Sequence, residues 1–190
     1  MLSHSLRALD LYRAAGHQVG QAAALNIIGY SHALLGNYPE ALTYCQQALA
    51  ACHDMEEDSW EEAVWDSLGY IHHKLGHYQQ AITCYQRSIG LLRGLADRYN
   101  EASTLAHLGD AHHSAGNTAA AHQAWAQALR IFDQIDHPDG DHVRAKLRFP
   151  ATRRITVLLT NRWITAQRPG VRAGSRRAGD CRAGVIRPVS

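Results

Sequence analysis

The chain repeats itself with a period of 40 residues. Shifting the sequence by that length superimposes three segments, which begin at Leu25, Trp65 and Leu105. Four positions are identical in all three copies: Gly29/Gly69/Gly109, His32/His72/His112, Gly36/Gly76/Gly116 and Ala41/Ala81/Ala121. A fixed period of this length is typical of stacked helical repeats, in which each unit buries its apolar face against the next.

Each copy is predicted to form two amphipathic helices separated by a tight turn, because apolar residues recur at three- and four-residue spacing on both sides of a Gly-containing break. Gly36 and its equivalents are expected to end the first helix, where a left-handed residue costs glycine little. Gly29 and its equivalents lie within a helix, where glycine costs about 1 kcal/mol relative to alanine. We therefore expect the paired helices to approach closely at those positions.

Composition agrees with an all-α fold and with a reduced, cytoplasmic protein. The chain has 190 residues, of which only five are Pro and two are Phe. Its four cysteines form no CxxC pair and no zinc-ligand spacing. Charged residues interrupt the N-terminal segment, and the longest aliphatic run of the second half, 155–159, is far shorter than the roughly 20 residues that cross a bilayer. We expect neither a signal peptide nor a membrane span.

These features resemble the tetratricopeptide repeat (TPR) family in its 40-residue form. The second copy carries the fullest pattern, namely Trp65, Leu68-Gly69, Gly76-x-Tyr78, Ala81, Tyr85 and Ser88-Ile89. Cys45 replaces the usual aromatic residue in the first copy, and Thr118 replaces Tyr in the third. The resemblance covers residues 1 to 135 and implies a solenoid of αα-hairpins that binds other proteins.

The register of the repeat predicts how the chain is divided. The expected segments are the second helix of a truncated repeat at 1–16, three TPR units at 17–56, 57–96 and 97–136, a capping helix at 137–149, and a mostly disordered Arg-rich tail at 150–190. The half-repeat at the start fits either truncation from a longer protein or a simple N-terminal cap.

Three segments further resemble the C-terminal TPR region of actinobacterial SARP/AfsR-type regulators. They are Gly16–Ala22, Leu108–His113 and Ala128–Asp139. The resemblance implies a sensing or scaffolding role in a transcriptional or signalling regulator. Because the sequence has no GxxxxGK[ST] loop, any nucleotide-driven switch would belong to another segment or to a partner.

Charge is distributed unevenly along the chain. Residues 1–140 contain 7 basic and 15 acidic side chains, whereas 141–190 contain 12 basic and two acidic ones. The net charge of +2 therefore conceals an acidic array and a basic tail. An Arg-rich tail can bind nucleic-acid phosphates, which would make this a nucleic-acid-binding accessory protein. We favour a solvated or accidental tail, such as a frameshift in GC-rich DNA produces; a degenerate fragment of a larger regulator is a third alternative.

The histidines do not predict a catalytic or metal site. Among the 13, His32 and its equivalents face the partner helix, where packing is favoured over ligation. His73 and His113 project toward the inner face, but no third ligand accompanies them. No Ser/His/Asp, Cys/His or paired-carboxylate set is supported. We expect no enzymatic activity, no cofactor and no metal.

Stacked helix pairs present a curved groove lined by the first helix of each repeat. Tyr30 and Tyr70 offer aromatic contacts there, and Asp66 and Asp110 can hold a basic side chain. Related domains that bind the C-terminal carboxylates of chaperones do so with Lys, Arg and Asn. The acidic residues at the inner positions of this chain disfavour binding of such a carboxylate. We predict a basic or apolar-aromatic protein or peptide partner, bound by Asn26, Tyr30, Ala33, Asp66, Tyr70, His73, Lys74, Asp110 and His113.

Overall fold

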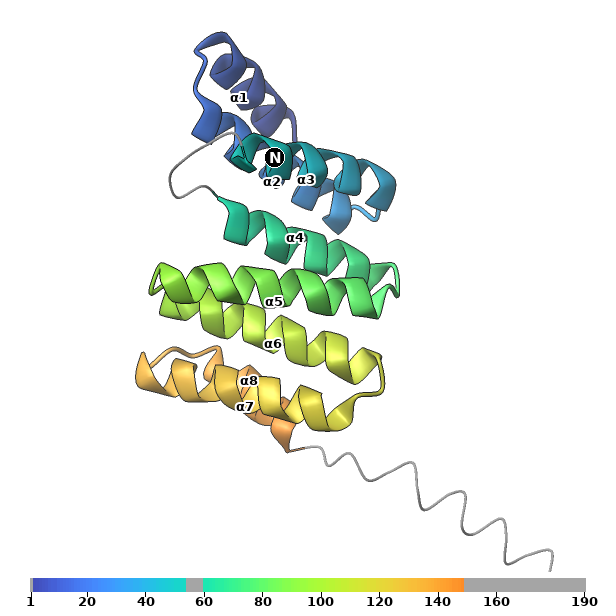
Figure 1. Ribbon diagram of the computed structural model, residues 1–190, viewed down its shortest axis with the longest axis vertical. Coiled ribbons are helices and arrows are strands. Elements are labelled where there is room, and N and C mark those ends of the chain that lie inside the picture. The colour runs from blue at the N-terminus through green and yellow to red at the C-terminus, as the bar shows by residue number, and fades with distance from the viewer. Residues whose placement is uncertain (1, 54–59, 149–190) are drawn as a thin grey trace, which may run out of the picture. The chain divides into compact units, whose positions relative to one another are not determined.

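The 40-residue period becomes a series of helix pairs in a computed structural model, which describes residues 2–53 and 60–148. This part of the chain is helical and contains no strand (Figure 1). Its helices are α1 (Leu2–Ala14), α2 (Gln18–Leu34), α3 (Tyr38–His53), α4 (Glu61–Lys74), α5 (Tyr78–Gly94), α6 (Arg98–Ser114), α7 (Thr118–Gln134) and α8 (Gly140–Leu147).

The helices form three TPR-type pairs preceded by a half-repeat. Pairs α2–α3, α4–α5 and α6–α7 make the closest contacts, and α1 packs on α2 while α8 packs on α7. Figure 1 shows the helix pairs succeeding one another from α1 to α7, with α3 and α5 in front of α2 and α6, and with α8 overlapping α7. These helices belong to one unit. The predictions for the 150–190 tail lie outside the described residues.

A left-handed residue ends the helix at each described turn. It occurs at positions 16, 36, 76, 96, 116 and 136, and in four of these turns it is glycine, with φ between 65° and 82°. The next residue donates its N–H to a carbonyl five positions earlier, as Asn37 does to His32 at 2.9 Å and Asn117 to His112 at 2.8 Å. This geometry satisfies helix-end carbonyls that otherwise lack donors. The prediction for Gly36 and its equivalents is confirmed.

Ala96 occupies the same turn position without being glycine, and its φ is 55°. A left-handed conformation costs a residue with a Cβ about 1 to 2 kcal/mol, and glycine avoids this cost. Glycine also loses more conformational entropy on folding, which offsets part of the gain. We expect Ala96→Gly to raise the free energy of unfolding by about 0.5 to 1 kcal/mol in urea denaturation. Ala115→Gly is the control, because Ala115 has a φ of −74° and should lose stability. An equal response of both variants would contradict this assignment.

Close contacts hold each pair together at the glycine within its first helix. A Cβ on Gly29 would lie 2.5 Å from Sγ of Cys45, one on Gly69 2.6 Å from the ring of Tyr85, and one on Gly109 2.3 Å from the ring of Trp125. Only hydrogen fits at these positions, because protein interiors are packed to crystal density. The expected close approach is confirmed, and it explains why a residue unfavourable to helices recurs within them.

The buried residues form two hydrophobic clusters. One joins α1 to α4 and includes Ile28, Ile71 and, from α5, Cys84. The other joins α5 to α8 and includes Tyr85, Trp125 and Phe132. The boundary between the clusters therefore passes through the second TPR, since α4 contributes to the first cluster and most of α5 to the second.

Candidate partner-binding groove

The first helices of successive repeats contact one another through side chains at equivalent positions. The rings of Tyr30 and Tyr70 lie 5.4 Å apart between α2 and α4. Lys74 places its ammonium 5.2 Å from the Tyr70 ring centre, a cation–π distance. Burial, together with the nearby Tyr70 and Asp66, raises the pKa of Tyr30, so its phenol stays protonated.

Asp66 links α4 to α6 through His107. The imidazole Nδ1 of His107 lies 3.1 Å from the Asp66 carboxylate. Burial by itself would lower the pKa of His107, but the hydrogen bond and the charge of Asp66 outweigh it, and the pKa is raised. This contact favours the charged imidazolium, so the pair is a salt bridge below that pKa.

Asp110 ends the row of inner side chains at the capping helix. Nζ of Lys146 on α8 lies 2.6 and 2.7 Å from its two carboxylate oxygens, and the indole of Trp125 donates to it at 3.1 Å. His113 also places its ring 5.5 Å from that of Trp125. Lys146 engages both carboxylate oxygens of Asp110, whereas His107 engages one oxygen of Asp66, so Asp66 is the acidic residue better placed to meet a basic partner.

A hollow of about 560 Å³ opens on this inner face. Its walls include large apolar side chains that are about half exposed, Ile27 (43%), Leu34 (56%) and Trp60 (45%). Small polar side chains from α4, α5 and α6 line it as well, namely Ser67, Ser88, Ser103 and Thr104. A hollow of this volume with apolar walls and few polar groups has the character of a ligand-binding pocket.

The structure brings together most of the groove residues predicted from sequence. Asn26, Tyr30 and Asp66 line the hollow, and Tyr70, His73, Lys74, Asp110 and His113 continue the row through the contacts described above and below. Ala33 is a correction: it is 2% exposed and packs in the core, so it cannot meet a partner. Its position about one turn from Tyr30 suggested that it lies on the groove surface, but the rotation of the helix turns it into the core.

Sequence reasoning missed the apolar wall of the hollow and part of its polar floor. Ile27 and Leu34 lie beside predicted inner positions on α2, and an exposed apolar pair there was the available signal. Ser88 lies on a second helix, α5, whose contribution to the inner face no helical periodicity indicates. Lys146 was missed because its contact with Asp110 depends on how α8 packs.

One Ser–His contact has the distance of a catalytic pair but lacks its surroundings. Oγ of Ser114 lies 2.9 Å from Nε2 of His73. Ser114 ends α6, where unpaired carbonyls rather than N–H donors gather, so no oxyanion site adjoins it. No hydrogen bond orients Nδ1 of His73 among the residues described. The pair therefore ties two repeats together.

Two further features bear on the kind of site this is. Across residues 2–53 and 60–148, no group of three or more His, Cys, Asp and Glu side chains is arranged to hold a metal ion. In the same ranges, no helix is both long and apolar enough to cross a membrane.

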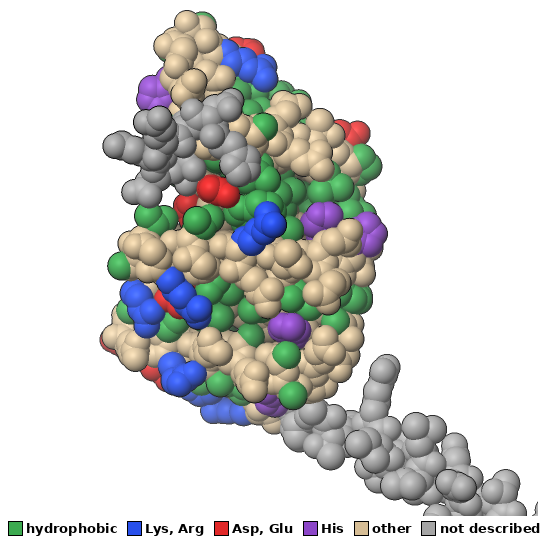
Figure 2. All heavy atoms as spheres, viewed as in Figure 1, with side chains coloured by type: hydrophobic (Ala, Val, Ile, Leu, Met, Phe, Trp, Pro, Cys, Tyr) green, Lys and Arg blue, Asp and Glu red, His purple; other side chains and the backbone are tan. Residues whose placement is uncertain are grey.

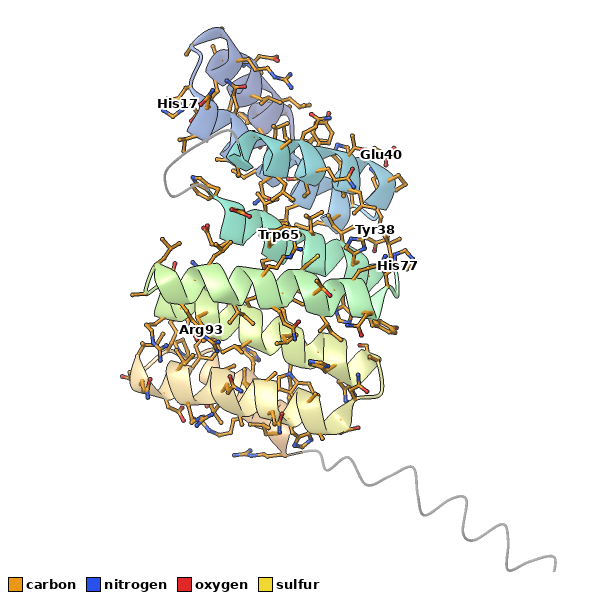
Figure 3. All side chains as sticks on the ribbon, in the orientation of Figure 1. His17, Tyr38, Glu40, Trp65, His77 and Arg93 are labelled. Atoms are coloured by element: carbon orange, nitrogen blue, oxygen red, sulfur yellow. The ribbon has the colours of Figure 1, made fainter. Side chains whose placement is uncertain are left out.

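The side of the molecule formed by α3 and α5 has a different surface. Figure 2 shows hydrophobic side chains over α4, between α3 and α5, with scattered charged side chains around them. Trp65, labelled on α4 in Figure 3, carries the guanidinium of Arg87 4.5 Å from its ring centre and donates to Glu61 at 2.9 Å. These contacts satisfy Trp65 within the chain, so the inner hollow is the stronger candidate site.

Solved structures share this fold at low sequence identity. BtubC (BKLC) from P. vanneervenii matches with a TM-score of 0.60 and 16% identity over 94% of this chain and 62% of its own. A signal transduction ATPase with a TPR sensor from Pyrococcus horikoshii matches with a TM-score of 0.68 and 18% identity, over 77% of this chain and 23% of its own. Apo RapI matches with a TM-score of 0.62 and 15% identity, over 76% of this chain and 43% of its own. The chain thus spans less than two thirds of each of these structures.

The sequence itself matches family models. No curated protein matches it. One tetratricopeptide repeat model matches residues 21–54 and another matches residues 60–134, together more than half of the chain. These ranges contain nearly all of the three helix pairs and all of their glycine contacts, and the chain belongs to the tetratricopeptide repeat family.

Proposed function

We propose that the inner face of this array captures a protein or peptide partner that is basic or apolar-aromatic. Tetratricopeptide repeats are protein-interaction scaffolds, generally without catalytic activity. The observation that supports this partner chemistry is the Tyr30–Tyr70 ring contact, which adjoins Asp66 at the hollow. Tyrosines contribute binding energy at low entropic cost, and the carboxylate selects positive charge.

The proposal includes a regulatory setting. The chain would act as the sensor or scaffold part of a bacterial transcriptional or signalling regulator, as its resemblance to SARP/AfsR-type proteins implies. A TPR sensor occurs in the Pyrococcus horikoshii ATPase of similar fold, which supports this role. Cys45 and Cys84 are buried thiols outside any disulfide, as expected in the cytoplasm, where we place the protein.

Peptide selection tests the assignment of the groove. Peptides selected from a random phage-displayed library on the full chain should be enriched in Lys, Arg and aromatic residues. Tyr70→Ala combined with Asp66→Ala should weaken binding of the selected peptides at least about tenfold, because such substitutions at a contact centre cost 1 kcal/mol or more each. Circular dichroism should show unchanged helicity.

A second Tyr–Asp pair provides the matched control. The hydroxyl of Tyr99 donates to Asp139 at 3.2 Å, and neither residue lines the hollow. Tyr99→Ala combined with Asp139→Ala should leave peptide binding within about twofold of wild type. Equal loss in the two double variants, or none in either, would refute the groove assignment.

A further inference from the structure

Ser88 differs from the residues at the equivalent positions of the other two repeats. Its side chain is 0% exposed, its Oγ has no hydrogen-bond partner, and it lines the inner hollow. The equivalent positions of the other two repeats are alanines, Ala48 and Ala128. A buried hydroxyl without a partner destabilises the folded state, and alanine would avoid that penalty. The stability of the fold therefore does not explain why this position is serine. The unpaired hydroxyl points to a binding partner whose group enters the hollow from outside.

The depth of the hollow has a cause in the second repeat. Ser67 occupies the position at which the first repeat has Ile27 and the third has His107. This shorter side chain, itself buried, lies with Thr104 and Ser88 in the lining and leaves the space open. Its walls remain apolar because of Ile27 and Leu34. The chemical group that fits this hollow is thus largely apolar and carries one hydrogen-bonding atom.

Charge around the hollow limits the partner further. Asp66 lines it with its side chain 27% exposed, and His107 engages one of the two carboxylate oxygens. Residues 1–140 carry an excess of eight acidic side chains over basic ones. A segment that brings positive charge beside the inserted group is favoured over an acidic one.

We propose that the hollow receives the tyrosine side chain of a basic partner segment, and that the buried hydroxyl of Ser88 turns toward the hollow to hydrogen-bond the phenol. The inference rests on the proposed function and adds the identity of the anchoring side chain. A tyrosine ring matches the apolar walls, and its hydroxyl both donates and accepts, as Ser88 does. Phenylalanine brings no hydrogen-bonding atom to Ser88 and leaves it unpaired, and so it binds less well.

Two amino-acid amides test the proposal on the full chain. The dissociation constant of N-acetyl-L-tyrosinamide, measured by NMR titration, should be about three to ten times lower than that of N-acetyl-L-phenylalaninamide. In Ser88→Ala the two constants should become equal within about twofold, through weaker binding of the tyrosine compound. Ser67→Ile should abolish binding of both compounds, since it fills the space.

Ser3, exposed on α1, supplies controls of the same chemistry. Ser3→Ala and Ser3→Ile should keep the wild-type preference for tyrosine. Thermal unfolding followed by circular dichroism shows whether each variant is folded, and Ser88→Ala keeps the test valid if Ser67→Ile does not fold. Equal affinity of the two compounds for wild type, or an unchanged preference in Ser88→Ala, overturns the proposal.

The outcome is separable from that of the groove assignment. If the Tyr70/Asp66 double variant loses the selected peptides but Ser67→Ile retains them, the groove binds its partner without a tyrosine anchor and only this inference fails. If the double variant retains the peptides while tyrosinamide still depends on Ser88, the hollow is a tyrosine-binding site and the wider groove assignment fails.

Discussion

Trp125→Ala is expected to lower the free energy of unfolding by about 3 to 5 kcal/mol. The indole is 5% exposed and lies in the cluster that joins α5 to α8. Its Nε1 also donates to Asp110 at 3.1 Å. Alanine would leave a cavity where the indole packs and would remove the donor. Urea unfolding followed by circular dichroism measures the loss.

The glycine opposite the indole makes this prediction sharper. In the wild-type chain a Cβ on Gly109 would lie 2.3 Å from the Trp125 ring, so Gly109→Ala should destabilise by about 1 to 3 kcal/mol. In the Trp125→Ala background that obstacle is absent, and the same substitution should stabilise by up to about 1 kcal/mol through helix propensity. Its effect therefore changes sign between the two backgrounds.

A double-mutant cycle over these two positions tests whether the effect of Gly109→Ala depends on the indole of Trp125. Gly90→Ala is the control, because a Cβ on Gly90 of α5 meets no atom within 4 Å. That substitution should stabilise the chain in both backgrounds. Independent, additive effects at Gly109 and Trp125 would show that the helices of the third pair are not held apart by this contact.

Removing the two arginines that pair with Glu101 should cost about 3 kcal/mol, the lower end of the range for a broken buried pair. Glu101 is 3% exposed, and its two carboxylate oxygens each contact an arginine. Arg93, labelled near the end of α5 in Figure 3, reaches it at 2.8 Å, and Arg98 reaches it at 2.5 Å. Arg93→Ala combined with Arg98→Ala would leave the carboxylate buried without a cation.

A third substitution separates the buried charge from the loss of arginine packing. Adding Glu101→Met to the double variant removes the charge and keeps most of the volume, so it should restore about 2 kcal/mol. Arg13→Ala combined with Arg130→Ala removes two other, exposed arginines and should change stability by less than about 1 kcal/mol. If the triple variant is no more stable than the double, the uncompensated carboxylate is not the cause.

Much of the fold could be predicted from sequence, because it depends on residues that act within one turn or recur in every repeat. The 40-residue period predicts the helix pairs, and an invariant glycine facing Cys45, Tyr85 or Trp125 predicts where each pair closes. The turns were recognisable where they contain glycine. Ala96 and Asp136 adopt the same left-handed conformation without that signal, because the hydrogen bonds around the turn and the packing of both helices impose it.

The candidate site was only partly accessible from sequence. Periodicity places Tyr30, Asp66 and Asp110 on the inner face, because one helix determines each of those positions. The hollow depends on several helices at once: Ser67 leaves the space, and Ser88 reaches it from α5. Ala33 shows the opposite error, since a residue one turn from the inner row can be rotated into the core.

The division of the core between α4 and α5 has a consequence for cooperativity. Repeat arrays unfold as linked neighbouring units, and the coupling between units sets whether they melt together. Here the cluster of α1–α4 and the cluster of α5–α8 meet within a single hairpin, where Tyr85 packs on Gly69. A ligand held in the inner hollow touches both halves, because α2 and α4 line it together with α5 and α6. Occupancy would therefore add contacts across the boundary between the two clusters, and the array should then unfold more nearly as a single unit.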